Sequence, residues 1–166
     1  LKLKHRDNFP ELHQRACKWY QDNDLIGDAI HHALLIENYE VVADLAERLV
    51  FESIERHELV TISSWLENLP RVVLQRKPWL SVAFAWILFR TRQFDRVELH
   101  LQDVEHSLEL QEQNAHIQSH ITAIKAYLAG IHGDIEQVTM MARNSLNLLP
   151  KKDKRLRGLM FSLLGS

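Results

Sequence analysis

Residues 119–150, SHITAIKAYLAGIHGDIEQVTMMARNSLNLLP, predict two antiparallel helices joined by a tight corner. Apolar side chains recur at steps of three and four residues, which places them along one face of each helix. We expect Gly130 and Gly133 to close the first helix, because glycine adopts the left-handed conformation of helix ends at little cost. Asp134 then supplies a carboxylate that can cap the second helix, and Pro150 stops that helix. Neither helix can bury its apolar face alone, so the pair must pack on itself and on its neighbours.

Two upstream segments share the features of this corner. Glu37 and Arg92 stand where Gly133 stands, and each corner is followed two positions later by an apolar residue and five positions later by valine. The residues that carry this pattern are Ala33, Glu37, Asn38, Tyr39, Glu40 and Val42; Ala85, Leu88, Arg92, Gln93, Phe94, Asp95 and Val97; and Ala126, Ala129, Gly133, Asp134, Ile135, Val138, Ala142, Ser145, Leu146 and Pro150. They resemble the tetratricopeptide repeat, a helix hairpin of 34 residues. The corners lie further apart than that, so we expect irregular repeats with an extra element between the first and the second.

The composition favours a helical fold. Only five glycines and four prolines occur among the 166 residues, which leaves few residues for turns. The hydrophobic fraction of 46% and the charged fraction of 25% are typical of a globular protein. The predicted fold is therefore all-α, an α-solenoid of antiparallel helix hairpins that forms a tetratricopeptide-like right-handed superhelix.

The expected organisation is one helical domain after a short linker. We interpret residues 1–10 as the linker and residues 11–166 as a single helical-repeat domain, with arm-like helices in 11–76 and tetratricopeptide-like hairpins in 77–166. The chain is interpreted as a fragment of a longer protein. Besides the hairpin of residues 119–150, helices are predicted at residues 11–23, 25–36, 39–51, 57–69, 71–76, 78–91, from Phe94 onward, and 151–164.

Residues 12–101 resemble the helical middle of MalT-like regulators, which are LuxR-type, ATP-dependent transcription activators of bacteria. The resemblance is carried by Leu12, His13, Ala16, Trp19, Tyr20, Ala29, Ile30, His32, Ala33, Leu34, Glu58, Leu59, Trp65, Leu66, Leu69, Pro70, Pro78, Ala85 and Trp86. In that family a nucleotide-binding module comes first, a helical arm and a tetratricopeptide-like superhelix follow, and a helix-turn-helix lies at the C-terminus. The resemblance implies that this segment contains neither the switch nor the DNA-binding end, and that it acts in the bacterial cytoplasm.

The function that the resemblance implies is a non-catalytic sensor or interaction module. Such a module binds a small-molecule inducer or a regulatory protein, contacts the other domains of the parent chain, and couples binding to activation. ATP is expected in the nucleotide-binding module of the parent chain, and no cofactor is expected in this segment. The alternative is a general protein–protein interaction scaffold of tetratricopeptide type that is unrelated to transcription.

Charge and cysteine content exclude several classes of function. The 20 basic and 22 acidic residues give a net charge of −2, which argues against direct contact with nucleic acid. A basic run, Lys151, Lys152, Lys154, Arg155 and Arg157, is therefore expected to be a solvated helix face. Cys17 is the single cysteine, which fits a reducing compartment and excludes a cysteine-rich zinc module. The longest apolar run, residues 79–89, is shorter than the roughly 20 residues of a membrane helix, so no membrane contact is expected.

No motif indicates catalysis or a resident metal. The sequence contains neither a GxxxxGK[ST] phosphate loop nor a GxSxG elbow, and we expect no catalytic residues. His116 and His120 are four residues apart, the spacing that binds zinc in HExxH enzymes. No third ligand has a characteristic spacing, so the two are expected to be solvated or hydrogen-bonded helix histidines, with no metal.

The aromatic residues suggest a recognition surface. If the hairpins stack as in tetratricopeptide proteins, the first helix of each hairpin lines a concave face. The candidate groove for a ligand or partner is then Trp79, Trp86, Phe89, His120 and Tyr127. The alternative is that Trp79 and Trp86 fill the core between hairpins, since large aromatic side chains dominate core energetics.

Apolar faces at the ends of such a stack also predict possible self-association, through residues 151–164 or the first helices.

Overall fold

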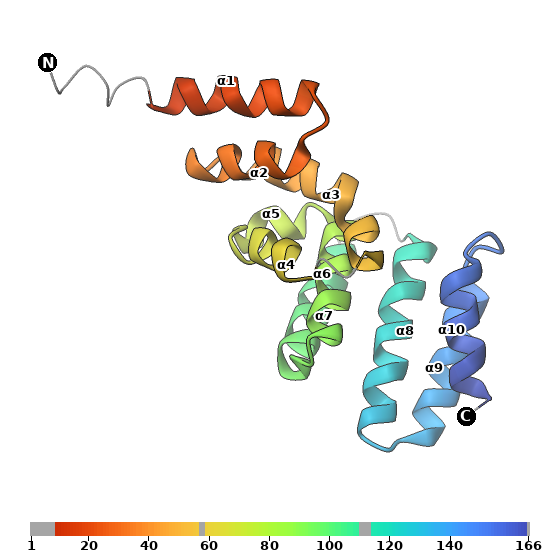
Figure 1. Ribbon diagram of the computed structural model, residues 1–166. Coiled ribbons are helices and arrows are strands. Elements are labelled where there is room, and N and C mark those ends of the chain that lie inside the picture. Colours follow the sequence, from red (N-terminus) through yellow and green to blue (C-terminus); the bar gives the residue numbers. More distant parts are fainter. Residues whose placement is uncertain (1–8, 57–58, 110–113, 166) are drawn as a thin grey trace, which may run out of the picture. The chain divides into compact units, whose positions relative to one another are not determined.

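A computed structural model describes residues 9–56, 59–109 and 114–165, and its helices confirm the all-α prediction. No strand occurs among these residues (Figure 1). The helices are α1 Phe9–Asp22, α2 Ile26–Leu35, α3 Tyr39–Glu55, α4 Leu59–Glu67, α5 Arg71–Gln75, α6 Pro78–Arg90, α7 Phe94–Glu109, α8 Ala115–Ile131, α9 Ile135–Leu148 and α10 Lys154–Leu164.

The chain forms two compact units, Leu1–Leu80 and Ser81–Ser166, and their boundary lies within α6. In the first unit, α2 packs against α1 and α3, and α3 packs against α4 and α5. Its core contains Ile30, Val42, Ile62 and Leu66, all fully buried. In the second unit α8, α9 and α10 pack together, with Ala123, Ala126, Ala142 and Met160 at their centre. The predicted division at residues 76 and 77 stays a prediction.

Four helix ends share one corner geometry. Asp24, Glu37, Arg92 and Gly133 have φ angles of 59°, 54°, 61° and 77°. At each, the N–H of the corner residue donates to the carbonyl three residues back, and the next N–H donates to the carbonyl five residues back, as in the Schellman motif. The left-handed conformation thus occurs at all three predicted corners, and the sequence interpretation missed the one at Asp24.

The same positions after each corner are also buried. The residues five and nine positions beyond the corner are at most 6% exposed in every case. They are Ala29, Val42, Val97 and Val138, then Ala33, Ala46, Leu101 and Ala142. Because these positions are four apart on a helix, they lie on the face that turns back onto the preceding helix. The same backbone corner therefore presents the same buried stripe each time.

Several predicted boundaries were wrong. Phe9 and Pro10 belong to α1 and not to a linker, because proline is compatible with the first turn of a helix; residues 1–8 lie outside the described residues. Gly130 lies inside α8, and Gly133 alone forms the corner. The predicted helix start at His57 lies outside the described residues. The last helix begins at Lys154 rather than Lys151, because Asp153 caps it.

Polar contacts fix α8, α9 and α10 to one another. The Ser145 hydroxyl donates to the Ser119 carbonyl at 2.9 Å, and both serines are fully buried. Ser119 in turn donates to the carbonyl of His116 at 2.6 Å. From α10, the Arg157 guanidinium donates to the Leu146 carbonyl at 2.9 Å, at the end of α9. Arg157 thus satisfies a carbonyl that the end of α9 leaves free.

Candidate functional site

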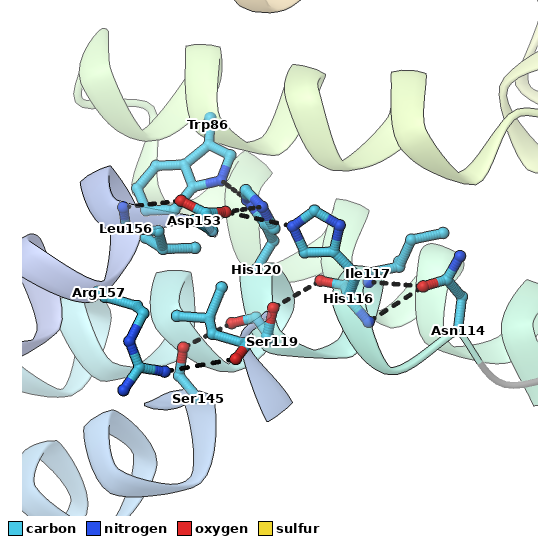
Figure 2. A network of polar contacts seen from close by, with 11 residues as sticks. Trp86, Asn114, His116, Ile117, Ser119, His120, Ser145, Asp153, Leu156 and Arg157 are labelled. Carbon is cyan, nitrogen blue, oxygen red and sulfur yellow. Dashed lines mark hydrogen bonds and ion pairs between the residues drawn. The ribbon is translucent and has the colours of Figure 1, made fainter. Parts of the chain in front are cut away.

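Two histidines of α8 and the aspartate that caps α10 meet in the second unit (Figure 2). His116 and His120 lie one turn apart, with ring centroids separated by 5.1 Å. The Asn114 side chain caps α8 by accepting hydrogen bonds from the backbone N–H groups of His116 and Ile117. Figure 1 shows α8 and α10 running in the same direction, with α9 running back between them in the chain. The first turns of α8 and α10 are therefore adjacent.

Asp153 uses its two carboxylate oxygens differently. Oδ1 accepts the backbone N–H of Leu156 at 3.1 Å and so caps α10. Oδ2 lies 3.2 Å from Nε2 of His116 and 3.6 Å from Nε2 of His120. The cap holds the carboxylate in a fixed orientation, with its second oxygen directed at the two imidazoles.

The indole of Trp86 approaches His120 from α6. Its Nε1–H donates to Nδ1 of His120 at 3.1 Å, as Figure 2 shows. Because an indole N–H can only donate, Nδ1 must present its lone pair, and the imidazole proton of neutral His120 is on Nε2, facing Asp153. One imidazole thus connects α6, α8 and α10.

Burial sets the charge state of this group. The side chains of His120, Asp153 and His116 are 11%, 20% and 31% exposed. Burial, together with the charge of His116, lowers the pKa of His120 to about 4, although Asp153 acts in the opposite direction. Burial also acts to raise the pKa of Asp153, but hydrogen bonds from Leu156 and His116 outweigh it and the pKa is lowered. At neutral pH a neutral His120 therefore faces a carboxylate.

The structure brings four of the five predicted groove residues together. The rings of Trp86 and Tyr127 are 6.2 Å apart, those of Phe89 and Tyr127 are 5.5 Å apart, and those of Trp86 and His120 are 6.4 Å apart. Trp79 is not among them. Its ring lies 5.7 Å from that of Phe51, in the unit Leu1–Leu80.

These aromatic side chains are half-buried. Trp86 and Tyr127 pack against the core of Ala123, Ala126 and Met160. For Trp86 this packing agrees with the alternative interpretation, in which the tryptophan fills the core. Their partial exposure neither supports nor contradicts the groove assignment, which stays a prediction.

A hollow of about 300 Å³ lies elsewhere in the same unit, between α7, α8 and α9, with a Glu105–Lys125 ion pair of 2.6 Å at its wall.

Sequence reasoning missed Asp153, which lies within the basic run between Lys152 and Lys154. Two signals point to it. An aspartate directly before a helical segment predicts an N-cap, and the first helices of successive hairpins begin at the same level of a stack. Together these two signals place Asp153 beside the first turns of α8, where the two histidines lie.

The basic run itself is exposed except for Arg157, whose guanidinium donates to carbonyls at the end of α9.

No protein-family model matches the sequence, and no solved structure matches the chain. Among the described residues, no helix has both the length and the apolar character needed to cross a membrane. The resemblance to MalT-like regulators and to the tetratricopeptide repeat therefore rests on the sequence residues quoted above.

Proposed function

We propose that this chain is a non-catalytic sensor or interaction module of a MalT-like, LuxR-type transcription regulator. The observation that carries the proposal is the shared corner at Glu37, Arg92 and Gly133, three positions at which the resemblance to helix-hairpin repeats expects a corner. In such an arrangement α6, α8 and α10 are the first helices of successive hairpins and line the concave face of a right-handed superhelix.

The surface that would receive the inducer or regulatory protein is the aromatic cluster of Trp86, Phe89, His120 and Tyr127. Its rings supply an apolar wall, and the phenolic hydroxyl of Tyr127 supplies a polar group that can orient a ligand. The physical mechanism is differential affinity. A ligand that binds better to one packing of α6 against α8 shifts the population toward that packing.

The remaining partners follow from the family. Other domains of the parent chain would receive the change, ATP would bind in the nucleotide-binding module, and the whole would act in the bacterial cytoplasm. A nucleotide-binding loop encoded upstream of Leu1 and a helix-turn-helix encoded downstream of Ser166 would support this regulator.

A thermal-shift screen of metabolites tests the ligand surface. We expect a stabilising compound whose effect is lost in Trp86→Ala and kept in Trp79→Ala, a matched tryptophan of the same helix that contacts Phe51 instead. A compound that stabilises both variants equally would contradict the aromatic cluster as the binding surface. Circular dichroism of both variants checks that each remains helical.

A general interaction scaffold is the second candidate, and the outer face of α9 favours it. Ile135 is 72% exposed and Met140 is 50% exposed. The two lie with Arg143 and Asn144 along a shallow surface hollow. Exposed apolar patches of this kind mark protein interaction sites. Flanking sequences without a phosphate loop and without a helix-turn-helix would favour the scaffold over the regulator.

A further inference from the structure

We propose that His116, His120 and Asp153 form a binding site for one divalent transition-metal ion, with zinc the expected ion. The site lies where the first turn of α8 meets the cap of α10 (Figure 2). This inference goes beyond the proposed function and stands independently of it, because it rests on these three side chains and not on the repeat corners.

The spacing of the ligand atoms fits a tetrahedral metal. Zinc binds imidazole nitrogen and carboxylate oxygen at about 2.0–2.2 Å, which places tetrahedral ligand atoms roughly 3.3 Å apart. Asp153 Oδ2 lies 3.2 Å and 3.6 Å from the two Nε2 atoms, and a ligand atom from each residue lies within 4.8 Å of the others. Small side-chain rotations can therefore bring all three onto one ion.

The donor set selects the ion. Two imidazoles with one carboxylate suit zinc and related transition metals, whereas calcium and magnesium prefer ligands that are all oxygen. The hydrogen bond from Leu156 already orients the carboxylate through Oδ1 and leaves Oδ2 directed at the histidines. Partial exposure of His116 and Asp153 gives the ion a path from solvent and leaves room for water as a fourth ligand.

Metal binding and the Trp86 hydrogen bond exclude each other. That bond needs the lone pair of His120 Nδ1, so the proton lies on Nε2. An ion on Nε2 needs a lone pair on that nitrogen, so the proton of the neutral ring moves from Nε2 to Nδ1. The N–H of the Trp86 indole and the new N–H at His120 Nδ1 would then face each other, so the indole must lose its hydrogen bond to His120. Zinc binding is therefore expected to release Trp86 and to change how α6 packs on α8.

Calorimetric titration of zinc into the full chain, followed in parallel by tryptophan fluorescence, tests the site. Asp153→Asn keeps an acceptor for the cap of α10 but removes the carboxylate charge. Asp134→Asn is its matched control, because Asp134 caps α9 in the same way by accepting from Gln137 at 3.0 Å. His116→Gln removes one imidazole, and His132→Gln, at the far end of α8, controls for the other histidines.

We expect one bound zinc per chain, and affinity at least about tenfold weaker in Asp153→Asn and in His116→Gln. The two controls should bind as the unaltered chain does. Trp86→Phe should abolish most of the fluorescence change and tighten binding by roughly fivefold, since no indole hydrogen bond has to be broken.

Absence of zinc binding would overturn the proposal. Equal affinity in all variants would also overturn it, because it would indicate adventitious binding to surface histidines. If Asp153→Asn loses its helical circular dichroism signal, the comparison of His116→Gln with His132→Gln decides instead. Binding at the site without a change in Trp86 fluorescence would overturn the release of the indole.

Discussion

His120 is the residue on which the polar contacts of the second unit converge. Its Nδ1 accepts from Trp86 of α6, its Nε2 faces Asp153 at the start of α10, and its own backbone belongs to α8. Because the two ring nitrogens have different partners, one tautomer satisfies both contacts. A change in the protonation of this single ring therefore affects three helices together.

The charge of His120 predicts acid sensitivity of the fold. Its pKa is lowered to about 4 in the fold, against about 6.5 when unfolded. The unfolded chain then binds more protons between these values, so the free energy of unfolding falls as pH decreases from about 6.5 to about 4. The loss should be at most about 3 kcal/mol. Urea unfolding across this range measures it, and His120→Gln should flatten the profile. An unchanged profile in that variant would contradict the assignment.

Ser145 predicts a modest and specific loss of stability. Its hydroxyl donates to the Ser119 carbonyl in a fully buried contact between α9 and α8. Ser145→Ala should lower the free energy of unfolding by about 1 kcal/mol, the typical contribution of one hydrogen bond. Ser162→Ala, at an exposed position of α10, should change it by less than about 0.5 kcal/mol. Equal effects in denaturant unfolding would argue against the contact.

At the scale of elements, most helices were predictable from the sequence and the exceptions have local causes. The apolar stripes, Pro70, Pro150 and Asp134 mark boundaries that the structure reproduces closely. The corner at Asp24 was missed because Ala29 stands five positions after it, where the other three corners have valine, although aspartate tolerates the left-handed conformation. Of the candidate metal site, the two histidines were visible as a spacing of four. Asp153 was not, because its proximity depends on packing of α10 beside α8.

One substitution at two glycines should have opposite effects. Gly133 has a φ of 77°, so Gly133→Ala should destabilise the α8–α9 hairpin by about 1 kcal/mol through backbone strain alone, since a new Cβ would meet no atom within 4 Å. Gly158 lies within α10, and a Cβ there also meets nothing within 4 Å. Gly158→Ala should stabilise by up to about 1 kcal/mol. Thermal unfolding of both variants measures this, and shifts of the same sign would contradict the corner geometry.

At the scale of the whole molecule, one difference from the predicted groove is that the two tryptophans of α6 pack in different units. Trp79 and Trp86 belong to the same helix, and the sequence pattern gave no reason to separate them. The unit boundary falls after Leu80. Trp79 packs on Phe51, whereas Trp86 packs on His120 and Tyr127. Contacts between segments distant in the chain cannot be read from periodicity.

Exposed apolar side chains on α10 predict self-association of the chain. Leu159 is 40% exposed and Phe161 is 57% exposed on this helix. Burying them against a second copy removes apolar surface from water. Light scattering should show a mass that rises with concentration, and Phe161→Glu should suppress the rise. Leu99→Glu, at a more exposed position of α7, should not. A strict monomer at high concentration would contradict the prediction.

The central structural claim is that α6 packs on α8 with the Trp86 indole donating to His120. The most direct measurement is a ¹H–¹⁵N spectrum of the tryptophan indole groups of the full chain, followed in deuterated buffer. Trp86, assigned from Trp86→Phe, should exchange more slowly than Trp19, whose side chain is mostly exposed on α1, and His120→Gln should accelerate its exchange. Exchange of Trp86 as fast as that of Trp19 would contradict the account.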